Sequence, residues 1–184
     1  MRRALVVYES MFGCTAAVAE AVASGLGTRL HVSVREVGTA GTVVPDDIEL
    51  VVVGGPTHAF GLSRPRTRSD AARQADRPLV SPGVGLREWL DAAVPGSPTC
   101  RAAAFDTRTA RPRLPGSAAR AATRRLRRAG FQPVASPASF YVTGTKGPLV
   151  EGELERARRW AEGLAASVAA EPVTEGASVA RSRG

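Results

Sequence analysis

The chain alternates between short runs of apolar residues and stretches in which apolar residues return every three or four positions. Leu5–Tyr8 and Leu50–Val53 are continuous apolar or aromatic runs, typical of strands buried on both faces of a parallel sheet. His31–Val37 alternates enough to predict a strand with one exposed face. Strands are therefore expected at 5–8, 31–37, 50–53 and 101–105, with 131–134 and 139–142 supplying a broken fifth strand.

Helices are predicted between these strands from apolar residues at helical spacing. The expected apolar stripes are Val18, Val22 and Leu26; Leu86, Trp89, Leu90 and Ala93; Ala119, Ala122, Leu126 and Ala129; and Leu154, Ala157, Ala161, Leu164 and Val168. Trp89 is expected to lie in the core, and Gly130 to end the helix Ser117–Ala129 in a left-handed cap.

The segment Leu62–Pro82 is long, polar and rich in arginine. Ser69–Ala75 is predicted to form a short helix within it. Long connections in compact domains serve either as lids over a site or as mobile links, and the sequence does not choose between the two.

Five strands that alternate with helices predict a single α/β domain over residues 1–170. Because crossovers between parallel strands are right-handed, such a chain forms a doubly wound parallel sheet with helices on both faces. Residues 171–184 are rich in small and polar side chains and are expected to be a disordered tail.

Composition sets limits on the class of protein. The 184 residues are 43% hydrophobic, enough for a substantial core in one domain. No apolar run is long enough for a membrane span, and a cytoplasmic location is expected. Cys14 and Cys100 show no motif spacing, which argues against a disulfide framework and against a zinc site.

The formal net charge of +8 raises the question of an anionic partner. The densest cluster of positively charged residues lies on the predicted helix Ser117–Ala129, opposite the apolar stripe. It consists of Arg120, Arg124, Arg125, Arg127 and Arg128. No aromatic residues are interleaved for base stacking, so we interpret the cluster as a solvated helix face and expect no nucleic-acid partner. Lys146 is the only lysine, which indicates a composition bias toward arginine.

The junction between the first strand and the first helix carries the clearest chemistry. A helix start gathers unpaired backbone N–H groups at the positive end of the helix dipole, where an anion such as a phosphate binds. Ser10 and Thr15 add hydroxyl groups, Gly13 permits close approach of the backbone, and Thr15 is expected to cap the helix. The loop has neither GxxxxGK[ST] nor GxGxxG, so it is not the phosphate loop of an NTPase or of a dinucleotide-binding Rossmann domain.

This junction resembles the signature of the flavodoxin family. The matching positions are Val6, Val7, Tyr8, Ser10, Gly13, Thr15, Ala19 and Val22. The resemblance implies a flavodoxin-like five-stranded parallel sheet in the order 2-1-3-4-5, with the loop Ser10–Thr15 around the terminal phosphate of FMN. Tyr8 and Ser10–Gly13 also look like the flavin loop of FMN-dependent quinone reductases. An ordinary glycine-containing turn in another α/β protein is the alternative.

Two further segments correspond by order and position to flavin contacts. Pro56–Gly61 follows the third strand and resembles the Gly-x-Pro-Thr segment of flavodoxin-like proteins, and Asp106–Arg108 are expected to leave the fourth strand for a loop beside the ring. Taken alone, His58 would be interpreted as an exposed loop histidine. The candidate cofactor-binding residues are Ser10, Met11, Phe12, Gly13, Cys14 and Thr15; Pro56, Thr57, His58, Phe60 and Gly61; and Asp106, Thr107 and Arg108.

The resemblance implies an FMN-binding electron-transfer protein that exchanges electrons with a redox partner protein. The net charge of +8 is compatible with an acidic partner. Two alternatives are left open. One is an FMN-dependent oxidoreductase acting on a quinone or a porphyrinogen, and the other is a binding module that kept the fold and lost the flavin. The sequence identifies neither the electron donor and acceptor nor the oligomeric state.

Overall fold

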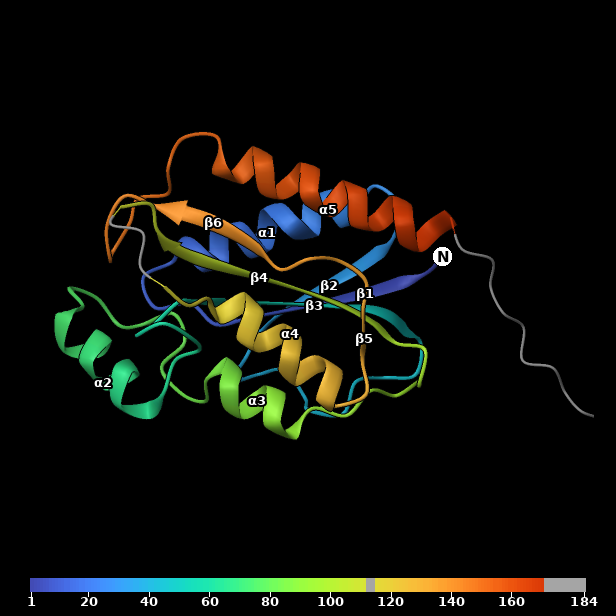
Figure 1. Cartoon of the computed structure of the whole chain (residues 1–184), viewed down its shortest axis with the longest axis horizontal. Coiled ribbons are helices and arrows are strands. Elements are labelled where there is room, and N and C mark those ends of the chain that lie inside the picture. The colour runs from blue at the N-terminus through green and yellow to red at the C-terminus, as the bar shows by residue number, and fades with distance from the viewer. Residues whose placement is uncertain (112–114, 171–184) are drawn as a thin grey trace, which may run out of the picture.

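The computed structural model describes residues 1–111 and 115–170, so the predicted tail at 171–184 lies outside the described residues. A parallel sheet separates two layers of helices (Figure 1). The described strands are β1 (Arg3–Tyr8), β2 (His31–Glu36), β3 (Ile48–Pro56), β4 (Arg101–Thr109), β5 (Gln132–Pro133) and β6 (Ala138–Val142). Their order is β2-β1-β3-β4-β5, with β6 also paired to β4, which confirms the predicted doubly wound sheet and its 2-1-3-4-5 order.

The predicted broken fifth strand is confirmed. β5 pairs with the start of β4 at Arg101 and Ala102, and β6 pairs with its end from Phe105 to Thr109. The pairing with β6 keeps β4 extended as far as Thr109. The prediction that Asp106, Thr107 and Arg108 leave the strand for a loop is therefore wrong, because all three lie within β4.

The helices of the described chain are α1 (Cys14–Leu26), α2 (Pro65–Gln74), α3 (Leu86–Ala92), α4 (Ala118–Arg128) and α5 (Glu153–Ala170). In Figure 1, α1 and α5 cover one face of the sheet, α3 and α4 cover the other, and α2 lies at the end of the molecule reached by the carboxyl ends of the strands. None of the helices in the described part of the chain is long and apolar enough to cross a membrane.

The two faces of the sheet bury separate apolar clusters, because successive residues of a strand point to opposite faces. Val6, Val52 and Phe105 pack with α1 and α5, whereas Val7 and Val51 pack with α3 and α4. Trp89 is fully buried in the second cluster, as predicted, and its indole N–H donates to the carbonyl groups of Ala40 and Gly41. Gly130 has a φ of 96°, which confirms the left-handed cap after α4.

Two helix starts differ from the predictions. α1 begins at Cys14 and its N-cap is Gly13, so the prediction that Thr15 caps this helix is wrong. α2 begins at Pro65, four residues before the predicted Ser69, because proline is well suited to the first position of a helix. The start of α2 is fixed by Thr67, whose hydroxyl accepts from the N–H of Arg64 and donates to its carbonyl.

Candidate functional site

A cavity of about 380 Å³ lies at the carboxyl ends of β1, β3 and β4, in the size range of small-molecule sites. Ligands of doubly wound sheets bind at this edge. Eleven of the fourteen predicted site residues line the cavity: Ser10, Met11, Phe12, Cys14, Thr15, Pro56, Thr57, His58, Phe60, Thr107 and Arg108. Gly13, Gly61 and Asp106 are not part of its lining.

The loop between β1 and α1 is held in shape by hydrogen bonds to a distant segment. The Ser10 N–H donates to Ser81 Oγ (3.0 Å), and the Ser81 N–H donates back to the Ser10 carbonyl (2.8 Å). The Val80 N–H donates to the carbonyl of Met11. Inside the loop, the hydroxyl oxygen of Ser10 accepts from the Gly13 N–H at 3.1 Å. Ser10 is fully buried, so its hydroxyl orients the loop from within.

Gly13 gives the end of this loop its conformation. Its φ of 102° lies in the left-handed region, which favours glycine, and a Cβ built there would meet no atom within 4 Å. In the described part of the chain, the N–H groups of Phe12, Cys14 and Thr15 donate to no protein acceptor. The first turn of α1 also contains no acidic residue. The donors at this helix start are therefore available to an anion from outside the chain.

Thr15 and Thr107 form a second polar element beneath the cavity. Their hydroxyl oxygens lie 2.7 Å apart, and both residues are buried. Because each hydroxyl carries one hydrogen, the mutual bond uses one of the two and leaves the other for a ligand. The adjacent Cys14 thiol lies beside Gly147, and burial raises its pKa, so it is protonated at neutral pH.

The turn after β3 projects an aromatic side chain at the rim of the cavity. His58 and Gly61 exchange backbone hydrogen bonds of 2.8 and 3.0 Å around Ala59 and Phe60. Both central residues have positive φ, 41° and 73°, which is strained for residues other than glycine. Gly116 packs against the backbone of this turn so closely that a Cβ at its position would lie 2.0 Å from the Phe60 carbonyl oxygen. The turn presents Phe60 with 57% of its surface exposed.

His58 is the titratable group of this turn. Burial, followed by the positive charge of Arg68, lowers the pKa of His58. The imidazole is therefore neutral at pH 7 and offers one donor and one acceptor nitrogen to the cavity wall.

Asp106 belongs to the packing of α4, and the expectation of a direct cofactor contact does not fit its position. It is fully buried, and its Oδ2 accepts from Ser117 Oγ (2.6 Å), Thr57 Oγ1 (3.0 Å) and the Ala119 N–H (3.0 Å). The carboxylate thus joins the end of β3 to the start of α4, where negative charge stabilises a helix. Arg108, two residues later, lines the cavity and donates to the Gly116 carbonyl.

One wall of the cavity was not predicted from the sequence. α2 supplies Thr67, Asp70, Ala71 and Gln74 to the lining. The Thr67 hydroxyl is engaged at the start of the helix, and Asp70 forms an ion pair with Arg73 through one carboxylate oxygen. The Gln74 amide and the second carboxylate oxygen of Asp70 are the polar groups that α2 offers to a ligand. The arginine-rich segment Leu62–Pro82 therefore contributes directly to the cavity. Ala59, Thr109, Pro115, Val142 and Thr145 complete the lining.

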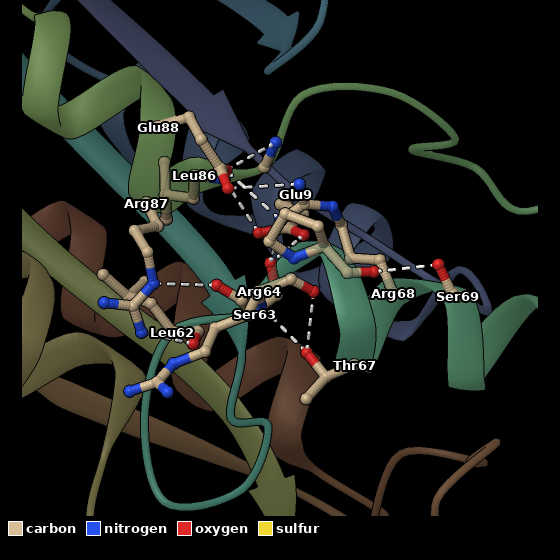
Figure 2. Close-up of polar contacts among 12 residues, drawn as sticks. Glu9, Leu62, Ser63, Arg64, Thr67, Arg68, Ser69, Leu86, Arg87 and Glu88 are labelled. Atoms are coloured by element: carbon tan, nitrogen blue, oxygen red, sulfur yellow. Dashed lines mark hydrogen bonds and ion pairs between the residues drawn. The ribbon is translucent and has the colours of Figure 1, made fainter.

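A buried polar network fastens α2 to the sheet (Figure 2). Glu9, the residue before the loop between β1 and α1, is fully buried and accepts from Ser63 Oγ (2.5 Å) and the Leu86 N–H (2.9 Å). Arg68 of α2 donates to Ser63 Oγ and forms a two-pronged ion pair with Glu88 of α3, both at 3.2 Å. Burial raises the pKa of Glu9, and the two hydrogen bonds oppose this rise. The network sets the position of α2 relative to β1.

The loop between β6 and α5 contacts the segment that follows α2. Lys146 Nζ lies 2.8 Å from Asp76 Oδ2 in an exposed ion pair, and the neighbouring Thr145 lines the cavity. An exposed pair of this kind contributes at most about 1 kcal/mol. It nevertheless joins two segments on either side of the cavity that are 70 residues apart in the sequence.

Comparisons with solved structures identify the fold. An archaeal flavodoxin is similar with a TM-score of 0.61 and 20% identity, covering 91% of this chain and 99% of that one. A flavodoxin from Streptococcus pneumonia gives 0.61 and 20%, covering 90% and 99%. A flavodiiron core from Synechocystis gives 0.57 and 18%, covering 91% of this chain and 36% of that one. No model of a known protein family and no curated protein matches the sequence.

These similarities place the chain among proteins with the flavodoxin-like fold, in agreement with the fold predicted from its first strand, loop and helix. At 20% identity or less, they establish the fold alone. The function must be argued from the site itself.

Proposed function

We propose that this chain binds FMN in the cavity and serves as an electron-transfer protein. The single observation that carries the proposal is the start of α1, where Phe12, Cys14 and Thr15 offer unpaired N–H groups and the first turn contains no carboxylate. A phosphate monoester fits this set of donors in both charge and hydrogen-bonding capacity. The solved structures with this fold include several flavodoxins, which supports FMN as the ligand.

The rest of the cavity suits a flat, largely apolar ring system. Met11, Pro56, Phe60, Pro115 and Val142 supply apolar lining around the polar groups. The bound flavin would supply the redox chemistry, whereas the chain binds its phosphate, excludes water from the ring and sets the charge beside it. Arg108 is the cationic residue of the lining, and His58 can donate or accept a proton at the wall.

The visible spectrum of the purified protein tests the proposal most directly. We expect a yellow protein, or a colourless one that turns yellow and quenches flavin fluorescence when FMN is added. A protein that stays colourless in the presence of excess FMN would contradict the proposal and support a binding module without flavin.

The α2 wall favours a second candidate, an FMN-dependent oxidoreductase acting on a small molecule such as a quinone or a porphyrinogen. Asp70 and Gln74 add polar groups to the cavity lining outside the loop Ser10–Thr15, where a second ligand could be recognised. Consumption of NAD(P)H that depends on an added quinone or porphyrinogen would favour this enzyme. Electron exchange only with other redox proteins would favour the carrier.

A further inference from the structure

The fold separates the charges of the chain. Residues 61–128 hold fifteen of the 25 basic residues and five of the 17 acidic ones, a formal net charge of +10, and the rest of the chain carries −2. Among the described residues of this segment, most of the arginines belong to α2, α3 and α4, which lie at the cavity end and on one face of the sheet (Figure 1). Arg101 of β4 instead donates to the Val168 carbonyl of α5 on the other face. A composition bias spread over the whole surface does not explain this asymmetry.

A set of guanidinium groups that form no ion pair with the described residues accounts for much of the excess. We define the arginine surface as Arg64, Arg87, Arg120, Arg124 and Arg128. Arg87 is half-buried and the other four are exposed. Within the described residues, none of the five takes part in an ion pair.

The parts of this surface contributed by different elements lie close together. The guanidinium of Arg87 on α3 donates to the carbonyls of Leu62 and Ser63, which brings it beside Arg64 (Figure 2). Arg125 of α4 forms an ion pair with Asp91 of α3 at 2.9 Å. Burial, and then the charges of Arg125 and Arg64, lower the pKa of Arg87. The carboxylates of Asp91 and Glu88 act in the opposite direction. A further carboxylate from a partner would add to their effect and favour the charged form of Arg87.

The arginine surface continues to the rim of the cavity. Arg64 follows the exposed Phe60 by four residues, and Arg120 lies in the first turn of α4, which begins two residues after Gly116. Gly116 in turn packs against the Phe60 backbone. Chain connectivity therefore places Arg64 and Arg120 in the segments that adjoin the turn of the exposed Phe60. This arrangement resembles an interface with an apolar centre and a charged rim.

We propose that Phe60 and the arginine surface form the docking site for an acidic redox protein. The inference rests on the proposed function, because a docking surface at the rim brings the partner's cofactor close to the one in the cavity. In each productive encounter one electron passes between the two cofactors, so that one is oxidised and the other reduced by a single electron.

The chemistry of the surface favours an acidic protein over other polyanions. Guanidinium groups match carboxylates in a two-pronged geometry. Phe60 is the exposed aromatic residue of the described turn, and α3 and α4 present no exposed aromatic residues on which successive bases could stack. Nucleic acid and anionic membrane therefore serve as the competing outcomes of the test.

The test measures binding to two haem proteins of opposite surface charge, acidic cytochrome b5 and basic cytochrome c. Isothermal titration is carried out on the full chain without added flavin, so a failure to bind FMN does not affect the result. We expect binding to cytochrome b5 that weakens at least tenfold between low salt and 0.5 M NaCl, because screening removes the attraction. We expect no binding to cytochrome c.

A matched pair of charge reversals locates the surface. Arg64→Glu with Arg124→Glu should weaken binding to cytochrome b5 at least tenfold at low salt. The control, Arg29→Glu with Arg159→Glu, changes the net charge equally at exposed positions outside residues 61–128 and should alter binding by less than twofold. Phe60→Ala should weaken binding by a factor that does not depend on salt. Melting temperatures confirm that each variant is folded.

Several outcomes would overturn the proposal. Equal losses in the two double variants would mean that net charge alone attracts the partner. A preference for cytochrome c, or no binding to cytochrome b5 at low salt, would refute an acidic docking partner. Tighter binding of a DNA duplex or of vesicles rich in phosphatidylserine, abolished by Arg64→Glu with Arg124→Glu, would assign the surface to nucleic acid or to membrane.

Discussion

Replacing Gly13 by alanine separates recognition of the phosphate from recognition of the ring. In the proposed complex, the three unpaired N–H groups at the start of α1 would face the phosphate. A hydrogen bond to a charged group contributes about 1.5 to 3 kcal/mol after exchange with water, and less where the phosphate stays exposed. A net preference of roughly 3 to 5 kcal/mol for FMN over riboflavin follows, which is about two to four orders of magnitude in affinity.

The cost of the substitution comes from the backbone alone. A Cβ at Gly13 meets no atom within 4 Å, but the φ of 102° costs a residue with a side chain about 1 to 2 kcal/mol. The free loop can relax to relieve this strain, and FMN must then restore the strained form when it binds. We expect Gly13→Ala to bind FMN roughly 5 to 30 times more weakly and riboflavin almost unchanged.

The affinities of the wild type and of Gly13→Ala for FMN and for riboflavin are measured by titrating the flavin-free protein and monitoring the quenching of flavin fluorescence. Gly163→Ala is the matched control, because this glycine lies in α5 with open space around it and no positive φ. It should leave both affinities unchanged and add up to about 1 kcal/mol of stability. Equal affinity of the wild type for FMN and riboflavin would refute the phosphate assignment. An equal loss for both flavins in Gly13→Ala would show that the loop shapes the whole cavity.

Three further predictions concern charge. Arg108→Glu should make the second one-electron reduction of bound flavin harder by roughly 1 to 4 kcal/mol, measured by anaerobic redox titration, and an unmoved potential would place Arg108 away from the ring. Burial raises the pKa of Glu9 above 4.5, so the folded wild type loses stability as the pH rises from 4.5 toward neutrality and this carboxyl ionises. The melting temperature of the wild type should therefore fall relative to that of Glu9→Gln over this range. A constant difference between the two melting temperatures at every pH would contradict this. Asp106→Ala leaves three donors without their acceptor and should cost about 3 to 5 kcal/mol, so the melting temperature should fall by roughly 6 to 20 °C. A fall under about 3 °C would refute the role of Asp106 in joining β3 to the start of α4.

The sheet and the first loop were accessible from the sequence because their signals are local. Buried parallel strands such as Leu50–Val53 are continuous apolar runs, and the order of elements then restricts the topology. The loop Ser10–Thr15 is a contiguous motif, so its position beside the cavity followed once the strand was recognised. The prediction that Thr15 caps α1 is wrong because Gly13 occupies the N-cap position, and glycine can occupy it without a side-chain hydrogen bond.

The α2 wall and the role of Asp106 depend on contacts between distant parts of the chain. α2 buries only Ala71, so its sequence shows no apolar stripe from which a packed helix could be inferred. Its anchor, Glu9, finds its partners 54 and 77 residues away. Asp106 follows the last apolar residue of β4, and only pairing with β6 and the donors of Thr57 and Ser117 show that it lies inside the protein.

The interruption of the fifth strand has a consequence for behaviour at high concentration. A sheet edge with a continuous row of free N–H and carbonyl groups is a template on which a second molecule can add a strand. Here β5 contributes two residues, one of them Pro133, and Pro137 precedes β6, so two positions on this edge have no N–H to offer. At the opposite edge, β2 carries the exposed, charged Arg35. Both features guard the folded chain against edge-to-edge aggregation.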